Sequence, residues 1–248
     1  MSINISCKLQ SSTITLNAPV YFDLQIANDS SETITVDLGH NHQSSLSFTI
    51  ETADGRVVDV PELSSSGLGT IGRIEIEPSG SYTRNYLLNE WYQFPGPGEY
   101  SIQAHLNTPV VSASGEAVDA ALPGTMKLTV TSRDPQTLTQ ISEELLKRIS
   151  NTTNAEEIAN AARALGHIND PLAVPYIKQA LKQRRYSWQH LIPGLARIGN
   201  QEAIDTLKDI EQHGDDEAGA SLARYYLEAL SPDAKPEVRE RLRNQPYG

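Results

Sequence analysis

The spacing of the apolar residues changes at Asp134–Pro135, and this change limits what the chain can fold into more than any other feature. Before it, apolar and polar residues alternate, as in "VYFDLQI" at residues 20–26. Alternation is typical of strands that bury one face. After it, apolar residues recur every three or four positions, beginning with Leu138, Ile141, Leu145 and Ile149. That period is typical of helices, so the sequence predicts a β half followed by an α half.

The first half contains seven or eight short segments of the alternating kind, separated by turn residues such as Ala53–Asp54–Gly55. The predicted strands cover residues 20–26, 33–38, 46–51, 56–60, 73–77, 81–88, 99–106 and 126–132. No helix lies between them to allow a parallel crossover, so we expect an antiparallel β-sandwich. The aromatic run Trp91–Tyr92–Gln93–Phe94 is expected to cover its core. Residues 61–72 and 107–124 are predicted to be loops.

Local signals mark where the helices of the second half begin. Asp134 followed by Pro135 is a strong pair of N-cap and first helical residue. Asn154 with Glu157 has the spacing of a capping box. Further helices are predicted after Asp170–Pro171, in "SWQHLIPGLARI" with its internal Pro193, after Gly199–Asn200, in "DEAGASLARYYLEAL" and after Pro236.

The helices repeat at an interval of 30 residues. Six positions of the first unit, Leu165, Ile168, Asp170, Ala173, Val174 and Ile177, match Leu195, Ile198, Asn200, Ala203, Ile204 and Leu207 of the second. A helix pair that repeats at this length is typical of stacked helical hairpins. The second half is therefore predicted to be an α-solenoid.

The repeated segment is similar to a known family. Residues 162–181, "ARALGHINDPLAVPYIKQAL", resemble the short HEAT-like repeat of bilin lyases (PBS-lyase HEAT-like type) and of bacterial scaffold proteins. The matching residues are Ala162, Ala164, Leu165, Gly166, Ile168, Asp170, Pro171, Ala173, Val174, Pro175, Ile177, Ala180 and Leu181. The resemblance implies HEAT-like helical hairpins but no particular activity, because such repeats serve enzymes and adaptors alike.

The first half resembles a bacterial immunoglobulin-like sandwich of the type related to intracellular proteinase-inhibitor domains. The segments "LNAPVYFDLQIANDSS" and "LNEWYQFPGPGEYSIQAHL" carry this resemblance. We therefore predict a multi-domain β + α protein, with an antiparallel immunoglobulin-like β-sandwich over residues 1–132 and a HEAT-like α-helical repeat domain over residues 133–248. The connection Thr131–Ser132–Arg133 is too short for a flexible linker, which predicts a fixed orientation of the two domains.

The charge of the chain is uneven and argues against nucleic acid as a partner. Residues 1–132 contain 5 Lys and Arg against 14 Asp and Glu, a net charge of −9, whereas residues 133–248 contain 15 against 17, a net charge of −2. Acidic surfaces repel phosphate backbones and anionic lipid. DNA-alkylation-repair glycosylases, which also use helical repeats, need a basic channel that this half lacks.

The N-terminal sequence and the cysteine content bear on the location of the protein. The first 16 residues contain neither a basic segment nor a continuous apolar one, so no signal peptide is predicted. No run of 18 apolar residues predicts a membrane-spanning helix. Cys7 has no second cysteine with which to form an internal disulfide. As encoded, the protein is expected in the cytoplasm, and a sequence shortened at its N-terminus would instead fit a periplasmic or exported protein.

Polar residues in the helical hairpin and in the loops are interpreted as structural. Asp170 is expected to cap a helix. His167 is expected to lie outside the core at the end of the preceding helix, with Arg197 in its place in the next unit. His40 and His42 are one residue apart, but no third metal ligand is evident nearby. No histidine is followed by glutamate, which excludes the paired His–Glu motifs of HEAT-type hydroxylases. The sequence predicts no catalytic, cofactor-binding or metal-binding residue.

One basic and aromatic segment is a candidate site of protein contact. Lys182–Gln183–Arg184–Arg185 is followed by Tyr186 and Trp188. The segment is interpreted either as a solvated helix end whose cations face the helix dipole, or as a hot spot for an acidic protein partner. The candidate contact residues are Tyr176, Arg184, Arg185, Tyr186 and Trp188.

The predicted function is that of a non-catalytic interaction or scaffold protein with an unidentified protein partner. Its contact surface would be the groove of the helical repeat or the loops at the ends of the sandwich. Two alternatives stay open: a bilin-lyase-like enzyme subunit, implied by the repeat resemblance, and a proteinase inhibitor acting through the sandwich loops. No cofactor, nucleic-acid binding or membrane insertion is predicted, and the oligomeric state is left open.

Overall fold

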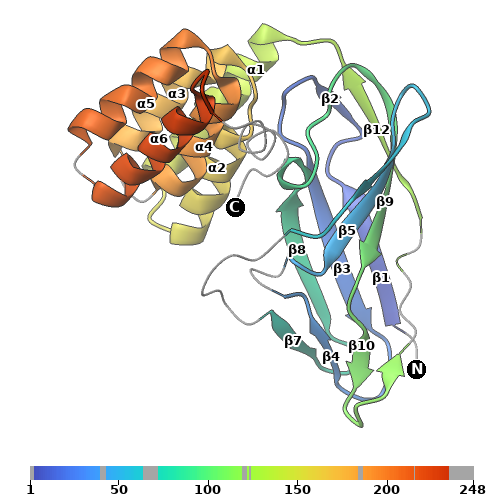
Figure 1. Ribbon diagram of the computed structural model, residues 1–248. Coiled ribbons are helices and arrows are strands. Elements are labelled where there is room, and N and C mark those ends of the chain that lie inside the picture. The colour runs from blue at the N-terminus through green and yellow to red at the C-terminus, as the bar shows by residue number, and fades with distance from the viewer. Residues whose placement is uncertain are drawn as a thin grey trace. The chain divides into compact units, whose positions relative to one another are not determined.

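The computed structural model describes residues 3–39, 43–63, 72–118, 122, 124–183, 187–214 and 216–234 of the 248. The described chain falls into two compact units (Figure 1). One contains the strands and ends at Ser132, and the other begins at Arg133 and contains the α-helices. The short segment Asn17–Pro19 is grouped with the helical unit. A β-rich region is therefore followed by a helical region, as the change of period predicts.

The β-rich unit contains three sheets among the described residues. The first has the order β1-β3-β8 (Ile3–Leu9, Tyr21–Asn28, Ser81–Leu87), and the second has the order β11-β10-β4-β7 (Ala117–Val118, Val110–Ser112, Ile34–Asp37, Arg73–Ile76). The third has the order β2-β12-β9-β5-β6 (Thr13–Thr15, Met126–Thr131, Gly98–Leu106, Leu46–Glu51, Val57–Val60). All eight predicted strands are present, with ends that differ by two residues at most.

The alternating residues of these strands form one hydrophobic core. In β3 the side chains of Phe22, Leu24 and Ile26 are completely buried. Trp91 and Phe94, expected to cover the core, are both buried as well. The Trp91 ring lies at a centroid distance of 6.1 Å from Phe22, and its Nε1 donates a hydrogen bond to the carbonyl of Leu46 (3.1 Å).

β1 lies outside the eight predicted strands, and two further features of the sheets differ from the prediction. β2 pairs with β12 in parallel, with Thr13 opposite Thr129, although antiparallel pairing is predicted throughout. No helical crossover is needed, because the two strands come from opposite ends of the β-rich unit and the other strands of the sheet separate them in sequence. The segment 107–124, predicted to be a loop, contains the antiparallel pair β10–β11. These strands have three and two residues, too few for alternation to show.

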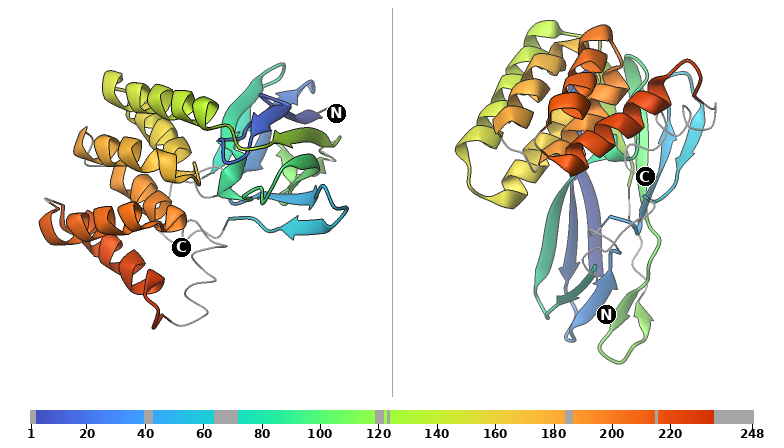
Figure 2. Two further views of the ribbon diagram at one scale, coloured as in Figure 1. Left: turned by 90° about the horizontal axis from the view of Figure 1, so that it is seen from above. Right: turned by 60° about the vertical axis from the view of Figure 1, so that its left-hand side comes forward.

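The helical unit contains six α-helices among the described residues. They are α1 (Pro135–Asn151), α2 (Ala155–Gly166), α3 (Val174–Gln183), α4 (Trp188–Ile198), α5 (Gln201–His213) and α6 (Glu217–Leu230). α3 lies in contact with α1 and α5, while α4 lies in contact with α2 and α6. The helices therefore form two layers of three, with α1, α3 and α5 in one layer and α2, α4 and α6 in the other (Figure 2).

The predicted helix starts are confirmed by their hydrogen bonds. The side chain of Asp134 accepts a bond from the backbone N–H of Gln136 (3.0 Å). The side chain of Asn154 accepts bonds from the N–H groups of Glu156 and Glu157 (2.9 and 3.2 Å). These bonds satisfy N–H groups of the first turn that have no partner within the helix.

The 30-residue repeat reappears as matched positions in successive helix pairs. Asp170 and Asn200 each accept a backbone bond at the start of the next helical segment, from Leu172 (3.1 Å) and from Ala203 (2.9 Å). The matched apolar pairs Leu165 and Leu195, Ala173 and Ala203, and Ile177 and Leu207 are all completely buried. At these pairs the repeat marks a helix cap or an interior position, whereas Ile198 and Ile204 are only half-buried although Ile168 and Val174 are completely buried.

Some predictions fall outside the described residues, namely the helix after Pro236, most of the segment 61–72, and the pair His40 and His42. Within the described part of the chain, no helix combines the length and the apolar composition that crossing a membrane requires.

Candidate functional site

A pocket of about 290 Å³ lies in the helical unit, where α3, α4, α5 and the start of α6 come together. All of its lining residues belong to this one unit. The pocket is concave, and it combines apolar side chains with a small number of charged ones. That composition is typical of binding sites, so the pocket is the candidate functional site.

Three helices supply the apolar part of the pocket. Trp188 and Ile192 are four residues apart on α4, so they lie on the same face of that helix. Ile192 is completely buried, whereas Trp188 is partly exposed. Leu181 from α3 and Ile210 from α5 lie beside them. A partly exposed indole among aliphatic side chains is the kind of surface that anchors an apolar side chain of a partner protein.

The charged side chains that line the pocket are two lysines and two aspartates. Lys178 and Lys182 are exposed, four residues apart on α3, and neither forms an ion pair or hydrogen bond within the described part of the chain. The acidic side chains are already engaged. Asp209 lies 3.3 Å from Nδ1 of His213, and Asp216 accepts hydrogen bonds from backbone N–H groups at the start of α6. The two lysines are therefore the charged groups of the pocket that are left to pair with carboxylates of a partner.

The structure brings one of the five predicted contact residues to this pocket. Trp188 lines it, whereas Tyr176 does not, and the Tyr176 hydroxyl donates instead to Glu143 on α1 (3.4 Å). Lys178 is a lining residue that sequence reasoning missed. The available signal was its position four residues before Lys182 on an exposed helix face. The other three predicted residues, Arg184, Arg185 and Tyr186, lie between α3 and α4, outside the described residues.

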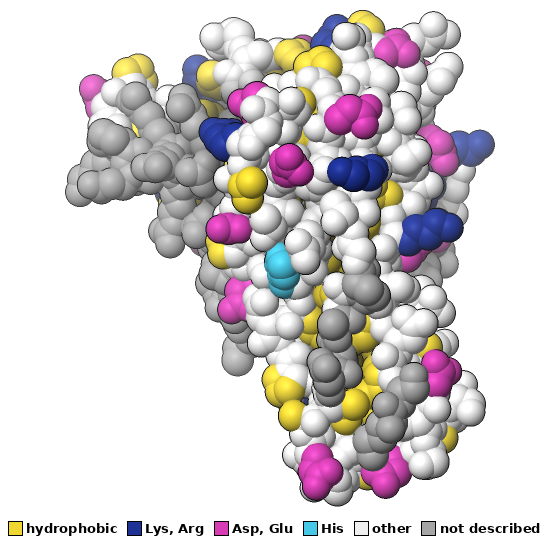
Figure 3. Space-filling view, turned by 90° about the vertical axis from the view of Figure 1, so that its right-hand side faces the viewer, with side chains coloured by type: hydrophobic (Ala, Val, Ile, Leu, Met, Phe, Trp, Pro, Cys, Tyr) yellow, Lys and Arg dark blue, Asp and Glu magenta, His cyan; other side chains and the backbone are white. Residues whose placement is uncertain are grey.

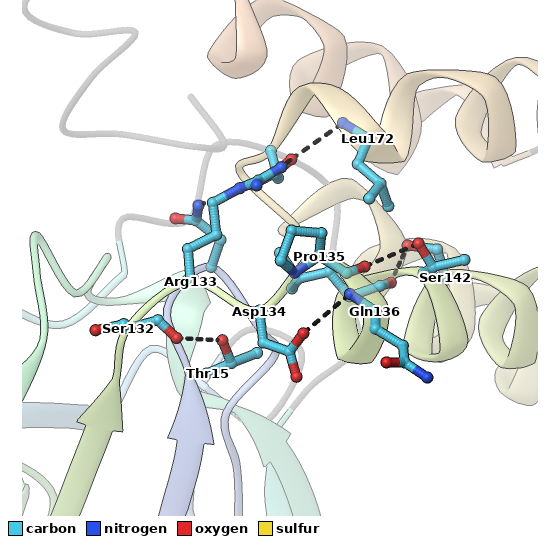
Figure 4. Close-up of polar contacts among 12 residues, drawn as sticks. Thr15, Ser132, Arg133, Asp134, Pro135, Gln136, Ser142 and Leu172 are labelled. Atoms are coloured by element: carbon cyan, nitrogen blue, oxygen red, sulfur yellow. Dashed lines mark hydrogen bonds and ion pairs between the residues drawn. The ribbon is translucent and has the colours of Figure 1, made fainter.

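Asp170 caps a helix, as predicted, and it also holds a cationic side chain. Its carboxylate accepts hydrogen bonds from Nε and Nη2 of Arg133 at 2.5 and 2.9 Å, and a further bond from the amide of Asn17 (3.3 Å). The guanidinium of Arg133 holds the pKa of Asp170 below its usual value. Figure 4 shows Arg133 and the Leu172 bond of this cluster, together with the cap bond from Gln136. We interpret Asp170 as a structural residue.

His167 is buried, and the expectation that it lies outside the core is wrong. Its side chain has no exposed surface. The reason is the close approach of α2 and α4, where a Cβ added at Gly166 would lie 2.2 Å from the carbonyl oxygen of His190. Burial, together with the nearby guanidinium of Arg197, lowers the pKa of His167 well below its usual value. The imidazole is therefore neutral and part of the packed interior.

Neither a metal-ligand cluster nor a reactive thiol is found among the described residues. No three His, Cys, Asp or Glu side chains in that part of the chain lie together as metal ligands would. Burial raises the pKa of the Cys7 thiol to about 12. At neutral pH Cys7 is therefore a thiol and not the nucleophilic thiolate.

Two protein families match the sequence. The family described as "Flagellar collar protein C, N-terminal domain" matches residues 8–131, which is half of the chain. The family described as "PBS lyase HEAT-like repeat" matches residues 159–183 and confirms the HEAT-like resemblance. The first match names a flagellar collar domain and does not test the resemblance of the β half to the immunoglobulin-like proteinase-inhibitor type, which stays a prediction.

Similarity to solved structures is low. The structural genomics target SoR45 has a TM-score of 0.31 at 14% identity, over 52% of this chain and 85% of that one. A β-glucosidase from Erythrobacter marinus has a TM-score of 0.32 at 11% identity, over 52% of this chain and 15% of the enzyme. The alkylpurine DNA glycosylase of Pseudomonas fluorescens has a TM-score of 0.26 at 10% identity, over 53% of this chain and 30% of the enzyme. At these scores the likenesses support no conclusion on fold or function. No curated protein matches the sequence.

Proposed function

The chain belongs to the flagellar collar protein C N-terminal domain family, and from this we propose that it is a non-catalytic interaction subunit of a bacterial cell-envelope assembly. A collar is by its name a structural part of the flagellum, which favours assembly over catalysis. The HEAT-like match at residues 159–183 supports the same role, because stacked helical repeats create extended contact surfaces. The partner in this proposal is a protein.

The finer architecture is part of the proposal. We take residues 1–132 as an immunoglobulin-like sandwich, since the buried residues of its sheets share one hydrophobic core. We take residues 133–248 as a short HEAT-like solenoid, since its helices lie in two layers and its sequence repeats every 30 residues. In such an array each surface is built from several helices, and the pocket at Trp188 is a surface of this kind.

The observation that carries the proposal is the composition of this pocket. Trp188 offers a partly exposed aromatic surface, and Lys178 and Lys182 offer positive charges that no described group neutralises. Aromatic side chains dominate the energetics of protein interfaces. Free charges at the rim favour a partner of opposite charge and speed its association.

The proposal can be tested by protein recovery from the native host. A tagged chain is crosslinked in cells, and the proteins recovered with it are quantified by mass spectrometry. We expect Trp188→Ala and Lys182→Glu to reduce the recovery of specific partners about tenfold. Lys147→Glu is the matched control, because Lys147 is also exposed but lies on α1 and does not line the pocket. Equal recovery with the wild-type chain and both pocket variants would contradict the proposal.

One observation favours a second function. The matched repeat carries the name of a PBS lyase, which supports a bilin-lyase-like activity as the alternative. The test is incubation of the full chain with phycocyanobilin and an apo-phycobiliprotein, followed by detection of a covalent adduct. Adduct formation no faster than without the chain would end this alternative.

A further inference from the structure

We propose that the pocket at Trp188 binds a second copy of this chain, through the exposed face of the end strand of the largest described sheet. The contacting element of the other copy is β6, with Val57 as its apolar anchor. The proposal rests on the proposed function, because it names the partner of the same pocket. Two surfaces of the chain carry the proposal, one on each unit. Each has an apolar part, and their charged side chains are of opposite sign.

The first surface is the outward face of β6, the last strand in the order β2-β12-β9-β5-β6. Val57 is 60% exposed, and with Tyr225 it is one of two exposed large hydrophobic side chains in the described part of the chain. Removing an exposed apolar side chain on an end strand from water lowers the free energy, which favours its burial against another surface. It is therefore suited to enter a pocket on another molecule.

Carboxylates stand on both sides of Val57. Glu51 of β5 is its partner across the strand pair, and Asp59 lies two residues further along β6. Side chains two residues apart in a strand, and those of directly opposed residues, share one face of the sheet. Both Glu51 and Asp59 are exposed. The outer face of the β5–β6 pair thus presents one apolar side chain with two carboxylates beside it.

The second surface is the pocket, and it has the opposite arrangement. Its apolar part contains the partly exposed Trp188, and its unpaired charges are those of Lys178 and Lys182. An interface in which Val57 contacts Trp188 would bring the carboxylates beside Val57 to the two lysines. Such a contact covers an exposed apolar side chain and brings carboxylates to two lysines that have no other ion-pair partner among the described residues.

The charge of the two halves agrees with this pairing. Residues 1–132 have a net charge of −9, so their surface is attracted to a cationic rim. Figure 3 shows a face of the molecule on which Asp and Glu side chains are spread singly and not gathered in one patch. The contact itself is specified by Val57 and the two carboxylates beside it.

The two surfaces differ, so the contact is heterologous. Each copy that uses its pocket leaves its own β6 edge free, and each copy that uses its edge leaves its pocket free. Heterologous contacts generate closed rings or open chains, depending on the rotation between successive copies. Self-association should therefore continue beyond the dimer as concentration rises.

The full chain is tested by sedimentation velocity over a concentration range of about 5 to 500 µM. We expect the mean sedimentation coefficient to increase with concentration at low salt. Raising the NaCl concentration from about 50 to 500 mM should reverse this increase, because exposed ion pairs are screened. A chain that stays monomeric over the whole range at low salt would overturn the proposal.

Variants locate the contact. Val57→Lys blocks the strand edge and Lys182→Glu blocks the pocket, and each should weaken self-association by about tenfold or more. Thr13→Lys, on the other end strand of the same sheet, and Lys147→Glu, on α1, make matched charge changes elsewhere and should have no effect. All four positions are exposed, and unchanged thermal unfolding curves will show that the variants are folded.

Mixing the two blocked variants gives the decisive result. The Val57→Lys chain retains its pocket, and the Lys182→Glu chain retains its edge. An equimolar mixture should therefore form a heterodimer that stops at two copies, at concentrations where each variant alone sediments as a monomer. No dimer in the mixture would overturn the pairing of edge with pocket. If the chain is monomeric while pocket variants still lose a different protein recovered from the host, the proposed function stands and this inference is wrong.

Discussion

At the scale of single residues, two histidines in the helical unit are held neutral by their surroundings. Burial is the main cause at both positions. It lowers the pKa of His167 well below its usual value and, with the nearby Arg163 guanidinium, lowers that of His190 to about 3. Moving an imidazole out of water disfavours its charged form. The folded helical unit therefore binds these two protons far less readily than the unfolded chain.

This difference predicts a loss of stability in mild acid. An unfolded histidine has a pKa near 6.5, so the contribution of the neutral imidazoles is fully present above that pH. It is lost as pH falls below 6.5, because the unfolded chain takes up protons that the folded chain does not. Each buried histidine adds a slope of up to about 1.4 kcal/mol per pH unit. We expect the helical unit to lose about 2 to 4 kcal/mol between pH 7 and pH 5.

The measurement is urea unfolding followed by helical circular dichroism at pH 7, 6 and 5. His190→Gln removes one titrating group and should reduce the pH slope of the unfolding free energy by about 1.4 kcal/mol per unit. His213→Gln is the control, because His213 is exposed at the end of α5. A slope that is the same in the wild-type chain and in His190→Gln would show that His190 does not titrate on unfolding.

Residue roles were predictable where their cause is local. The cap at Asp170 follows from Asp and Pro standing next to each other at a helix start. Its bonds to Arg133 and Asn17 join residues 37 and 153 positions apart, and no local pattern indicates them. The burial of His167 likewise depends on α4, which follows α3 and begins 21 residues further along the chain, at Trp188. Position within one helix therefore gave the wrong environment for this histidine.

At the scale of elements, the close approach of α2 and α4 is set by two glycines. A Cβ at Gly166 would lie 2.2 Å from the carbonyl oxygen of His190, and one at Gly194 would lie 2.5 Å from that of Gly166. Both obstacles are backbone atoms, so no side chain can turn away to make room. Arg197 strengthens the same contact by donating a hydrogen bond from Nη2 to the Gly166 carbonyl (2.6 Å). The two helices pack at a distance that only glycine permits.

We therefore expect Gly166→Ala to destabilise the helical unit by at least about 2 kcal/mol, since the two helices must separate to admit the methyl group. The matched control is Gly219→Ala on α6, where the added Cβ would meet the Trp188 ring at 3.5 Å, an ordinary contact distance. This control should be neutral or stabilising by up to about 1 kcal/mol, because alanine favours helix. The midpoints of urea unfolding give both values, and equal effects of the two substitutions would contradict this account.

Element predictions mostly followed the length of the pattern, although β1, with seven residues, was not among the predicted strands. The helices of the repeat and the longer strands carry several periods each, and their positions follow from the sequence. β10, β11 and β2 have two or three residues each and were missed as strands. They are ordered by pairing, β10 with β4 and β2 with β12, and a pairing partner distant in sequence leaves no local pattern.

At the scale of the whole molecule, the division of the chain was visible in its periodicity, whereas the candidate site was not. The family match ends at Thr131, the last residue of β12, and the helical unit begins two residues later. The pocket needs residues from four helices, and these residues lie between positions 178 and 219. Sequence reasoning reached Trp188 through its composition, but which other helices face it depends on packing that no single segment encodes.

The two-domain proposal predicts that residues 133–248 fold without the β-rich unit. The fragment keeps the bidentate pair of Arg133 with Asp170 and loses the single hydrogen bond from Asn17 (3.3 Å). We expect helical circular dichroism and one cooperative thermal transition, with a loss of about 1 kcal/mol from the missing bond. The control fragment 152–248 lacks α1, whose Leu138 and Ile149 are completely buried, and it should show no cooperative transition. If residues 133–248 also melt without cooperativity, the helical unit is not an independent domain and the boundary at residue 132 is wrong.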